Sequence, residues 1–283
     1  MSEAHSEDTV APPPGESLAA GAGERRPVRF RAGGFQPEVK KLTAIASIVG
    51  LLGAWQLAST VGWLNPLFLP SPWTIAQTLW ELLVRGDLLR HVGVSLFRVG
   101  SGWIIGVAAG VFVGLAMGIF SLSRSLGLPL ISALYPIPKI ALLPLFILWL
   151  GIGEAPKILT IALGVFFPTA ISTFAGVDGV ARNLIRMGQS FDLSFSDMVS
   201  KIVLPGALPS ILAGMRISTS TALLLVVSAE MIGAQLGLGS FVLAAGNSMQ
   251  TENLLAGVVT LSALGLTLAT LLSRLEKRLL RWR

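Results

Sequence analysis

Very few side chains in this sequence could carry out covalent chemistry. It contains no cysteine, which excludes disulfides, a thiolate metal site and a cysteine nucleophile. Its two histidines, His5 and His91, are far apart and lack the spacing of metal ligands, so we expect both to be solvated. No Gly-x-x-x-x-Gly-Lys-Ser/Thr segment is present to cradle nucleotide phosphates. The sequence therefore predicts no catalytic residue, no metal site and no cofactor on this chain.

Two charged residues lie within long apolar blocks, where an ionised group is costly and usually faces a cavity. Lys139 directly follows Pro138, and it is either a positive element on an anion path or a partner of a carbonyl freed by a proline. Glu230 would repel an anion, which favours a structural role bonded to backbone or to a neighbouring helix. Lys139, Pro138 and Glu230 are the candidate residues of a substrate pathway.

The composition indicates that the elements which carry these residues are membrane helices. Of the 283 residues, 53% are hydrophobic and only 13% are charged, about half the charged share of a soluble domain. A bilayer core needs about 20 apolar residues per helix. The sequence predicts six such spans, over residues 42–61, 92–120, 126–150, 158–176, 207–232 and 254–273. We therefore expect an all-α membrane protein with six transmembrane helices.

Basic residues gather beside the first and last apolar blocks. Retention of Lys and Arg on the cytoplasmic side then places both termini inside, which is consistent with six spans because an even number returns the chain to its starting side. The formal charge of +6 is explained in this way without nucleic acid, for which the chain has no soluble basic face. Residues 1–41 are rich in Pro, Gly, Ser and Glu and then in Arg, which predicts a disordered, basic cytoplasmic tail. Residues 42–283 form the membrane domain.

Glycines, prolines and a cap signal add detail to these spans. Five glycines recur every four residues in the second predicted span, which predicts a seam for close helix packing; they are Gly102, Gly106, Gly110, Gly114 and Gly118. Prolines in the third and fourth predicted spans favour broken helices of the kind that border transport pathways; they are Pro136, Pro138, Pro144 and Pro168. Ser71-Pro72 predicts the start of a short helix, to about residue 84, along the outer membrane surface.

The most polar internal segment, residues 177–205, is placed in the cytoplasm by the alternation of spans. It predicts two short helices around Leu193-Ser194, followed by Ile202-Val203-Leu204-Pro205. This segment resembles the coupling loop of the ABC importer permeases, whose pattern is Glu-Ala-Ala, three residues, Gly, nine residues, Ile-x-Leu-Pro. Ile202, Leu204 and Pro205 match the closing element. Arg186, Met187 and Gly188 stand at the Glu-Ala-Ala positions, and Asp192 stands at the glycine.

The resemblance extends from about residue 42 to the C-terminus. Within the family, this sequence resembles the nitrate, sulfonate and taurine branch. It is carried by Leu69-Pro70-Ser71-Pro72, residues 143–149, Gly151-Ile152-Gly153-Glu154, residues 204–209 and Ala229-Glu230. It implies a type I ABC importer permease core that works as a homodimer in the bacterial cytoplasmic (inner) membrane. It also implies two ATPase subunits that bind ATP and magnesium, and a periplasmic or lipid-anchored binding protein. The residues expected to couple to the ATPase are Arg186, Met187, Gly188, Asp192, Ser194, Ile202, Leu204 and Pro205.

Several alternatives stay open at this point. Arg186 either faces a charge-adapted groove of the ATPase or extends its side chain to lipid headgroups. The whole chain could also be a carrier or channel driven by an ion gradient, although such proteins lack the Ile-x-Leu-Pro loop. A membrane-embedded enzyme would need paired carboxylates or a nucleophile with a base at membrane depth, which the sequence does not supply.

Overall fold

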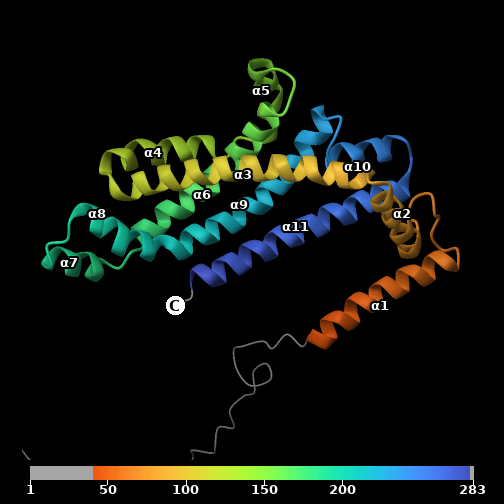
Figure 1. Ribbon diagram of the computed structural model, residues 1–283, viewed down its shortest axis with the longest axis horizontal. Helices are drawn as coiled ribbons and strands as arrows, with labels where there is room; N and C mark the ends of the chain where they lie inside the picture. The colour runs from red at the N-terminus through yellow and green to blue at the C-terminus, as the bar shows by residue number, and fades with distance from the viewer. Residues whose placement is uncertain (1–40, 281–283) are drawn as a thin grey trace, which may run out of the picture. The chain divides into compact units, whose positions relative to one another are not determined.

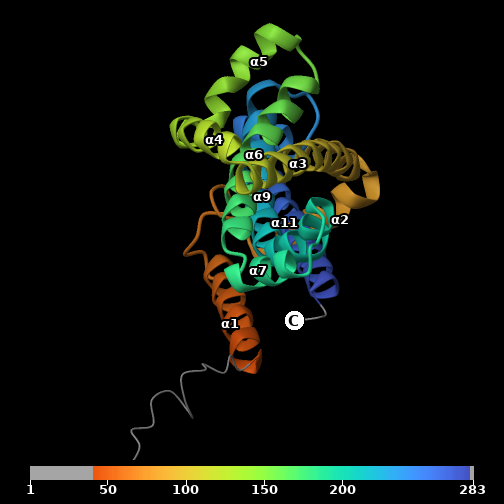
Figure 2. The same ribbon diagram turned by 90° about the vertical axis from the view of Figure 1, so that its left-hand side faces the viewer.

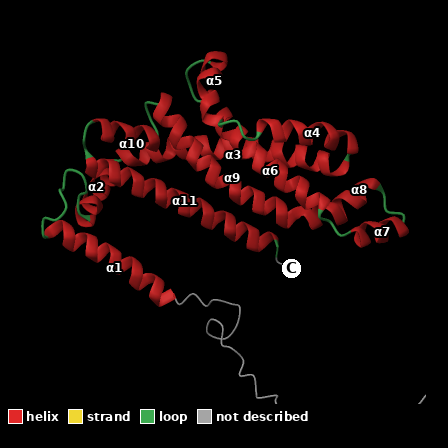
Figure 3. Ribbon diagram, turned by 180° about the vertical axis from the view of Figure 1, so that it is seen from behind, coloured by secondary structure: helices red, strands yellow, loops and turns green. Residues whose placement is uncertain are grey.

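The computed structural model describes residues 41–280, and every regular element in that range is a helix (Figure 3). The chain divides into two compact units, Met1–Leu51 and Leu52–Arg283. The predicted tail, residues 1–41, lies outside the described residues except for Lys41, the first residue of α1. The helices are α1 (Lys41–Thr60), α2 (Pro72–Arg85), α3 (Asp87–Ile119), α4 (Ser121–Leu134), η1 (Lys139–Leu142), α5 (Leu143–Leu150), α6 (Ala155–Asp178), α7 (Arg182–Ser190), α8 (Phe195–Met198), η2 (Val199–Val203), α9 (Leu204–Gly233), α10 (Leu238–Asn247) and α11 (Thr251–Leu279).

Four of the described helices are long and apolar enough to cross a membrane, namely α3, α6, the continuous helix Phe195–Gly233 and α11. A fifth crossing results if the bent pair α4 and η1–α5 counts as one. The second, fourth, fifth and sixth predicted spans each coincide with one of these helices. In α1 the described apolar part, Ile45–Thr60, is shorter than a full crossing. The all-helical membrane fold is thus confirmed, and the number of six crossings stays a prediction.

Helix α6 forms the core of the second unit, between α3 and α9 (Figure 1). More than half of its apolar window, 56%, is buried, whereas the window of α11 is only 11% buried. A helix buried on this scale is apolar on all sides because it contacts protein rather than lipid. Pro168 lies inside α6, yet the helix continues from Ala155 to Asp178. The expectation that this proline breaks the helix is wrong, since packing on both sides holds α6 in place.

The five glycines of α3 all face α6. A methyl group on any of them would lie 2.5–2.8 Å from an atom of α6, closer than real side chains approach. At Gly106 the nearest atoms are the backbone oxygen of Ala162 and Cβ of Val165. Small residues in register allow two helix backbones to approach closely, which is the main source of helix association in lipid. A second set, Gly176 in α6 and Gly214 in α9, allows the same approach between those helices.

The third predicted span is sharply bent. Helix α4 ends at Leu134, and η1–α5 leaves it at an angle of 89°. Pro136 and Pro138 lie in the break, and Pro144 occupies the first turn of α5. Proline removes a helix hydrogen bond and disfavours helix at the residue before it, so two prolines separated by one residue end α4. As a result α5 projects from the bundle in two perpendicular views (Figure 1 and Figure 2).

Helix α2 begins as the sequence predicts. The Ser71 hydroxyl accepts a hydrogen bond of 3.1 Å from the Thr74 N–H, and Pro72 is the first helical residue. The helix ends at Arg85, where Gly86 adopts φ +82° and turns the chain directly into α3. A left-handed φ is accessible to glycine because it has no Cβ.

Candidate functional site

Arg98 of α3 is the centre of a buried ion cluster that sequence reasoning did not identify. The residue is 2% exposed, and its guanidinium contacts three separate segments. It donates to Glu154 from Nε at 2.5 Å and from Nη2 at 2.7 Å, and to Glu230 from Nη1 at 2.8 Å. Nη1 also donates to the backbone oxygen of Leu236 at 2.6 Å. Arg98 therefore joins α3, the turn before α6 and the α9–α10 turn.

Glu230 is 1% exposed, and three donor groups from different parts of the chain, on Ser95, Arg98 and Gly239, hold its carboxylate. The Ser95 hydroxyl lies 2.7 Å from one carboxylate oxygen, and the Gly239 N–H donates to the other at 2.8 Å. Ser95 in turn accepts a 2.8 Å hydrogen bond from the Leu238 N–H. A buried charge is tolerated when it is paired and hydrogen-bonded in this way. These contacts are of the kind expected for the structural role that the sequence favoured for Glu230.

His91 belongs to the same cluster, and the expectation that it is solvated is wrong. Its Nδ1 lies 2.8 Å from the backbone oxygen of Gly237 and 3.0 Å from the backbone nitrogen. Its ring packs against Phe241, with the ring centres 5.3 Å apart. Gly237 itself adopts φ +133°, and a Cβ there would collide with the Glu230 carboxylate. The tight α9–α10 turn requires glycine at this position and brings His91 against it.

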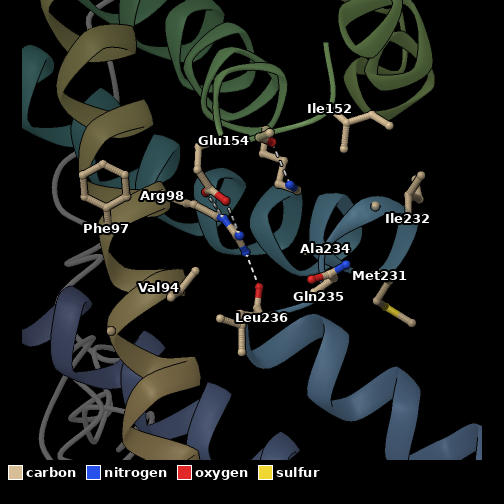
Figure 4. A pocket seen from close by; sticks show the side chains of 14 residues that line it. Val94, Phe97, Arg98, Ile152, Glu154, Met231, Ile232, Ala234, Gln235 and Leu236 are labelled. Atoms are coloured by element: carbon tan, nitrogen blue, oxygen red, sulfur yellow. Dashed lines mark hydrogen bonds and ion pairs between the residues drawn. The ribbon is translucent and has the colours of Figure 1, made fainter.

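A pocket of about 830 Å³ opens beside the cluster (Figure 4). Its wall is formed by α3, the turn before α6 and the end of α9; the polar or charged residues among its lining are Arg98, Glu154, Lys157 and Gln235. Figure 4 shows the Arg98 side chain pointing to Glu154 on one side and to Leu236 on the other. The Glu154 side chain is 46% exposed, so its carboxylate borders the pocket as well as the cluster.

Electrostatics favour the charged form of Glu154, the carboxylate that borders the pocket. The Arg98 guanidinium, which donates two hydrogen bonds to Glu154, holds the pKa of this carboxyl below its ordinary value. Lys157 is 5% exposed, and its ammonium donates a 2.7 Å hydrogen bond to the backbone oxygen of Gly153. Within residues 41–280 the Lys157 ammonium forms no ion pair. Helix α6 begins at Ala155, three residues before the predicted fourth span, and therefore contains Lys157.

The predicted coupling segment lies at the other end of the bundle, where α7 and α8 project at the left of Figure 1. Helices α7 and α8 flank Leu193-Ser194, as the sequence predicts. Asp192, which stands at the glycine position of the pattern, adopts φ +49°, a left-handed conformation that aspartate adopts more readily than most residues with a side chain. The Ser194 hydroxyl then caps α8 by accepting from the Asp197 N–H at 3.1 Å.

The two halves of the coupling motif meet in space. Gly188 of α7 is buried against Ile202, and a Cβ at Gly188 would lie 2.7 Å from Cδ1 of that isoleucine. The second short helix is not separate from the fifth span, because α8, η2 and α9 form one continuous helix. The π-helical turn of η2 explains this, since the Leu204 N–H bonds to the Val199 oxygen and Pro205 needs no donor. Arg186, Met187 and Leu204 are exposed, and Pro205 is half-buried.

Lys139 lies away from the ion cluster, at the bend after Pro138. Its ammonium donates to the backbone oxygens of Tyr135 and Leu134 and lies 4.5 Å from the centre of the Phe167 ring. With Pro138, Lys139 lines a small pocket of about 190 Å³ that also contains Thr221 of α9. Glu230 does not line this pocket, so the structure does not bring the three candidate pathway residues together.

Sequence reasoning missed Arg98 even though a usable signal was present. An arginine inside a predicted span has to find a partner or a cavity. The partners themselves could not be found in this way, because Glu154 and Glu230 are 56 and 132 residues away.

Comparison with known proteins places this architecture in a family. Residues 106–282 match the family described as "Binding-protein-dependent transport system inner membrane component". An aliphatic sulfonates transport permease protein, SsuC, of Bacillus subtilis is 37% identical over 234 residues, which cover 82% of this chain and 84% of the relative. The taurine transport system permease protein TauC of Escherichia coli is 36% identical over 244 residues, which cover 84% of this chain and 89% of the relative.

A solved structure of the MetNI methionine ABC transporter in an inward-facing conformation has a similar chain. It covers 71% of this chain and 98% of its own length, with a TM-score of 0.56 and 20% identity, and at that identity the likeness concerns the fold. The resemblance to the sulfonate and taurine branch of ABC permeases is thus confirmed. This multi-pass membrane chain belongs to the family of binding-protein-dependent transport system inner membrane components, the permease subunits of ABC importers.

Proposed function

We propose that this chain forms the translocation pathway of an ATP-driven importer for a small sulfonate-type anion, of the kind named for its relatives. The observation that carries the proposal is identity of 36–37% to a sulfonate and a taurine permease over more than four fifths of the chain. Likeness on that scale includes both the coupling segment and the pocket beside Arg98. Nitrate and other small anions are the neighbouring possibilities within the same branch.

The proposed transporter contains two copies of this chain and two ATPase subunits. ATP and magnesium bind to the ATPases, and this chain holds no cofactor of its own. A binding protein delivers substrate from outside, and both termini of the chain lie on the cytoplasmic side of the inner membrane. Lipid surrounds the helices, as the large apolar exposure of α11 supports.

Residues 177–205 are proposed to couple the ATPase to the membrane helices. Two aromatic side chains at the tip of this segment, Phe191 and Phe195, are 75% and 63% exposed in a region otherwise rich in polar residues. Exposed aromatics on a short, well-capped helix are typical of a surface that docks into a partner's groove. Because α8 continues into α9, a displacement of the tip would reach the bundle as a rigid-body movement.

Lys139 and Pro138 are proposed to line the pathway, while Glu230 holds its wall in place. The Lys139 ammonium is stabilised by carbonyl oxygens and aromatic rings and not by a carboxylate of the described residues. It therefore keeps an uncompensated positive charge close to Thr221, where an anion could pass. Glu230 is fully engaged by Ser95, Arg98 and Gly239, which supports a structural role.

The test is uptake in proteoliposomes that contain this chain with its cognate ATPase and binding protein. Radiolabelled taurine and ethanesulfonate serve as substrates. We expect uptake that requires ATP, the ATPase and the binding protein, and that survives ionophores which collapse ion gradients. Uptake by the purified chain alone, abolished by those ionophores, would instead establish the carrier alternative.

A further inference from the structure

The pocket beside Arg98 presents two opposite charges to its interior. The Glu154 carboxylate borders it with a side chain that is 46% exposed, and Lys157 lines it from the first turn of α6. The geometry points to a binding site for a small zwitterion, one that carries an ammonium group and a sulfonate or carboxylate group a few bonds apart. This inference rests on the proposed function, because it names the substrate class that the importer would accept.

The charge balance of the pocket favours a zwitterion over a simple anion. Arg98 and Lys157 carry two positive charges, and Glu154 and Glu230 carry two negative charges, so the pocket and its wall are neutral together. An added anion would leave an excess charge in a place of low dielectric constant. A zwitterion keeps the total at zero while it gains one attractive contact at each end.

Arg98 is unlike the other two charged groups that border the pocket, because all but one of its N–H groups already donate a hydrogen bond. Its guanidinium donates four hydrogen bonds to Glu154, Glu230 and Leu236, out of the five that its N–H groups can make. Anion recognition therefore falls to Lys157 and not to Arg98.

Lys157 has the free donors that recognition of an anionic group requires. Its ammonium has three N–H groups, and one donates to the Gly153 oxygen. A lysine that is 5% exposed and forms no ion pair with any described residue is costly to bury, and an anionic group from the pocket would reduce this cost. The Gln235 side chain, also in the lining, offers a neutral donor.

Glu154 is the complementary group for an ammonium. Arg98 holds the carboxylate in place from one side, and its remaining lone pairs are available on the exposed side. A carboxylate fixed by a buried arginine is already oriented, so binding does not have to order it. Taurine and β-alanine each carry an ammonium and an anionic group on a two-carbon chain, and they differ in the anionic end.

The experiment measures thermal unfolding of the full-length purified chain in detergent through its seven tryptophans. The probes are taurine, β-alanine, ethanesulfonate and ethylamine, each titrated at constant ionic strength. We expect taurine, β-alanine or both to raise Tm saturably, with apparent affinity at least roughly tenfold higher than for ethanesulfonate or ethylamine, since each charged end contributes a charge-assisted hydrogen bond. The comparison of taurine with β-alanine decides between a sulfonate and a carboxylate.

Variants assign the two ends of the ligand. In Lys157→Gln the preference for taurine over ethylamine should disappear, and Lys157→Arg should restore part of it. In Glu154→Gln, which keeps a side-chain oxygen for Arg98, the preference over ethanesulfonate should disappear. Lys277→Gln, at an exposed position near the end of α11, is the matched control and should bind like the wild type.

Two outcomes overturn the inference. In one, ethanesulfonate shifts Tm as strongly as taurine does, and in the other Lys157→Gln retains the full response to both zwitterions. ATP-driven uptake of a sulfonate together with either result would leave the proposed function standing without this site. Selective zwitterion binding without any ATP-driven uptake would support the site and count against the importer.

Discussion

Arg98 and Lys201 both pair with a carboxylate, but they do so at opposite ends of the bundle and in opposite surroundings. The Arg98 side chain is 3% exposed and joins segments 56 and 132 residues apart. The Lys201 side chain is 66% exposed and pairs with Asp197, one helical turn away, at 2.7 Å. The first pair depends on the tertiary structure, whereas the second could form on an isolated helix.

This difference separates a rigid region from one that is free to bind a partner. Around Arg98, backbone and side chains from three elements satisfy one another, so little remains for an outside protein. Around Lys201, the bonds are local and the aromatic tips of the segment stay exposed. An importer of the proposed kind needs both properties, a stable wall for the pathway and an accessible surface for the ATPase.

The substitution Arg98→Gln should have the largest effect. It leaves Glu230 buried without its positive partner, which costs about 3–5 kcal/mol of stability. The free energy of unfolding in detergent measures this loss, and the double variant Arg98→Met with Glu230→Met should recover much of it. Equal instability of the double variant would mean that the charges are not what matters at this position.

The substitution Gly106→Ala should come next, at about 1–3 kcal/mol, because the new Cβ meets the Ala162 backbone oxygen and Val165 Cβ. The stability loss of Gly106→Ala is best compared with that of Gly188→Ala in the predicted coupling segment. There the new Cβ meets the flexible ends of Ile202 and Met198, which can move aside. We expect a clearly smaller loss of stability for Gly188→Ala, measured by the same unfolding assay. Gly100→Ala, with no atom within 4 Å of the new Cβ, is the control.

The charge reversal Arg186→Glu should reduce transport several-fold while leaving the unfolding free energy unchanged within about 0.5 kcal/mol, since the residue is exposed on α7. ATP-driven uptake and ATPase activity in proteoliposomes measure the coupling. Unchanged uptake would favour the alternative that Arg186 only extends to lipid headgroups.

Acid should weaken the rigid region through Glu154. The pKa of this carboxyl is lower in the folded chain than in the unfolded chain, because Arg98 binds its charged form. The stabilisation is therefore complete above the unfolded pKa, about 4.3, and disappears as the pH falls through the lower folded value. Tm of the wild type should fall more steeply with acid than Tm of Glu154→Gln, and parallel curves would contradict this assignment.

The substitution Lys201→Gln should have the smallest effect on stability. An exposed pair one turn apart on a helix contributes about 0.2–1 kcal/mol, and salt screens it further. Unfolding measured at low and high salt should differ less for the variant than for the wild type. A loss of stability as large as that of Arg98→Gln would contradict the distinction between the two ends of the helix bundle.

Helix positions were predictable to a large extent, because apolar blocks, caps and glycine spacing are local properties of a sequence. The Ser71-Pro72 start, the proline bend after Leu134 and the helix break at Leu193-Ser194 are confirmed, although the helix that begins after Ser194 continues into the fifth span. Prediction was wrong at Pro168, where neighbouring helices maintain a continuous α6, and it did not foresee α10. In both cases the structure of the segment depends more on the helices packed around it than on its own residues.

The sequence by itself determined that the chain lies in a membrane, where most of its long helices lie and which face of α3 lacks side chains. Only the tertiary structure decided that Arg98, Glu154 and Glu230 meet, that His91 is part of their cluster, and that Lys157 shares a pocket with Glu154. The reason is physical: apolar patterning acts between residues a few positions apart, whereas a buried charge finds its partner only where packed helices bring one within reach.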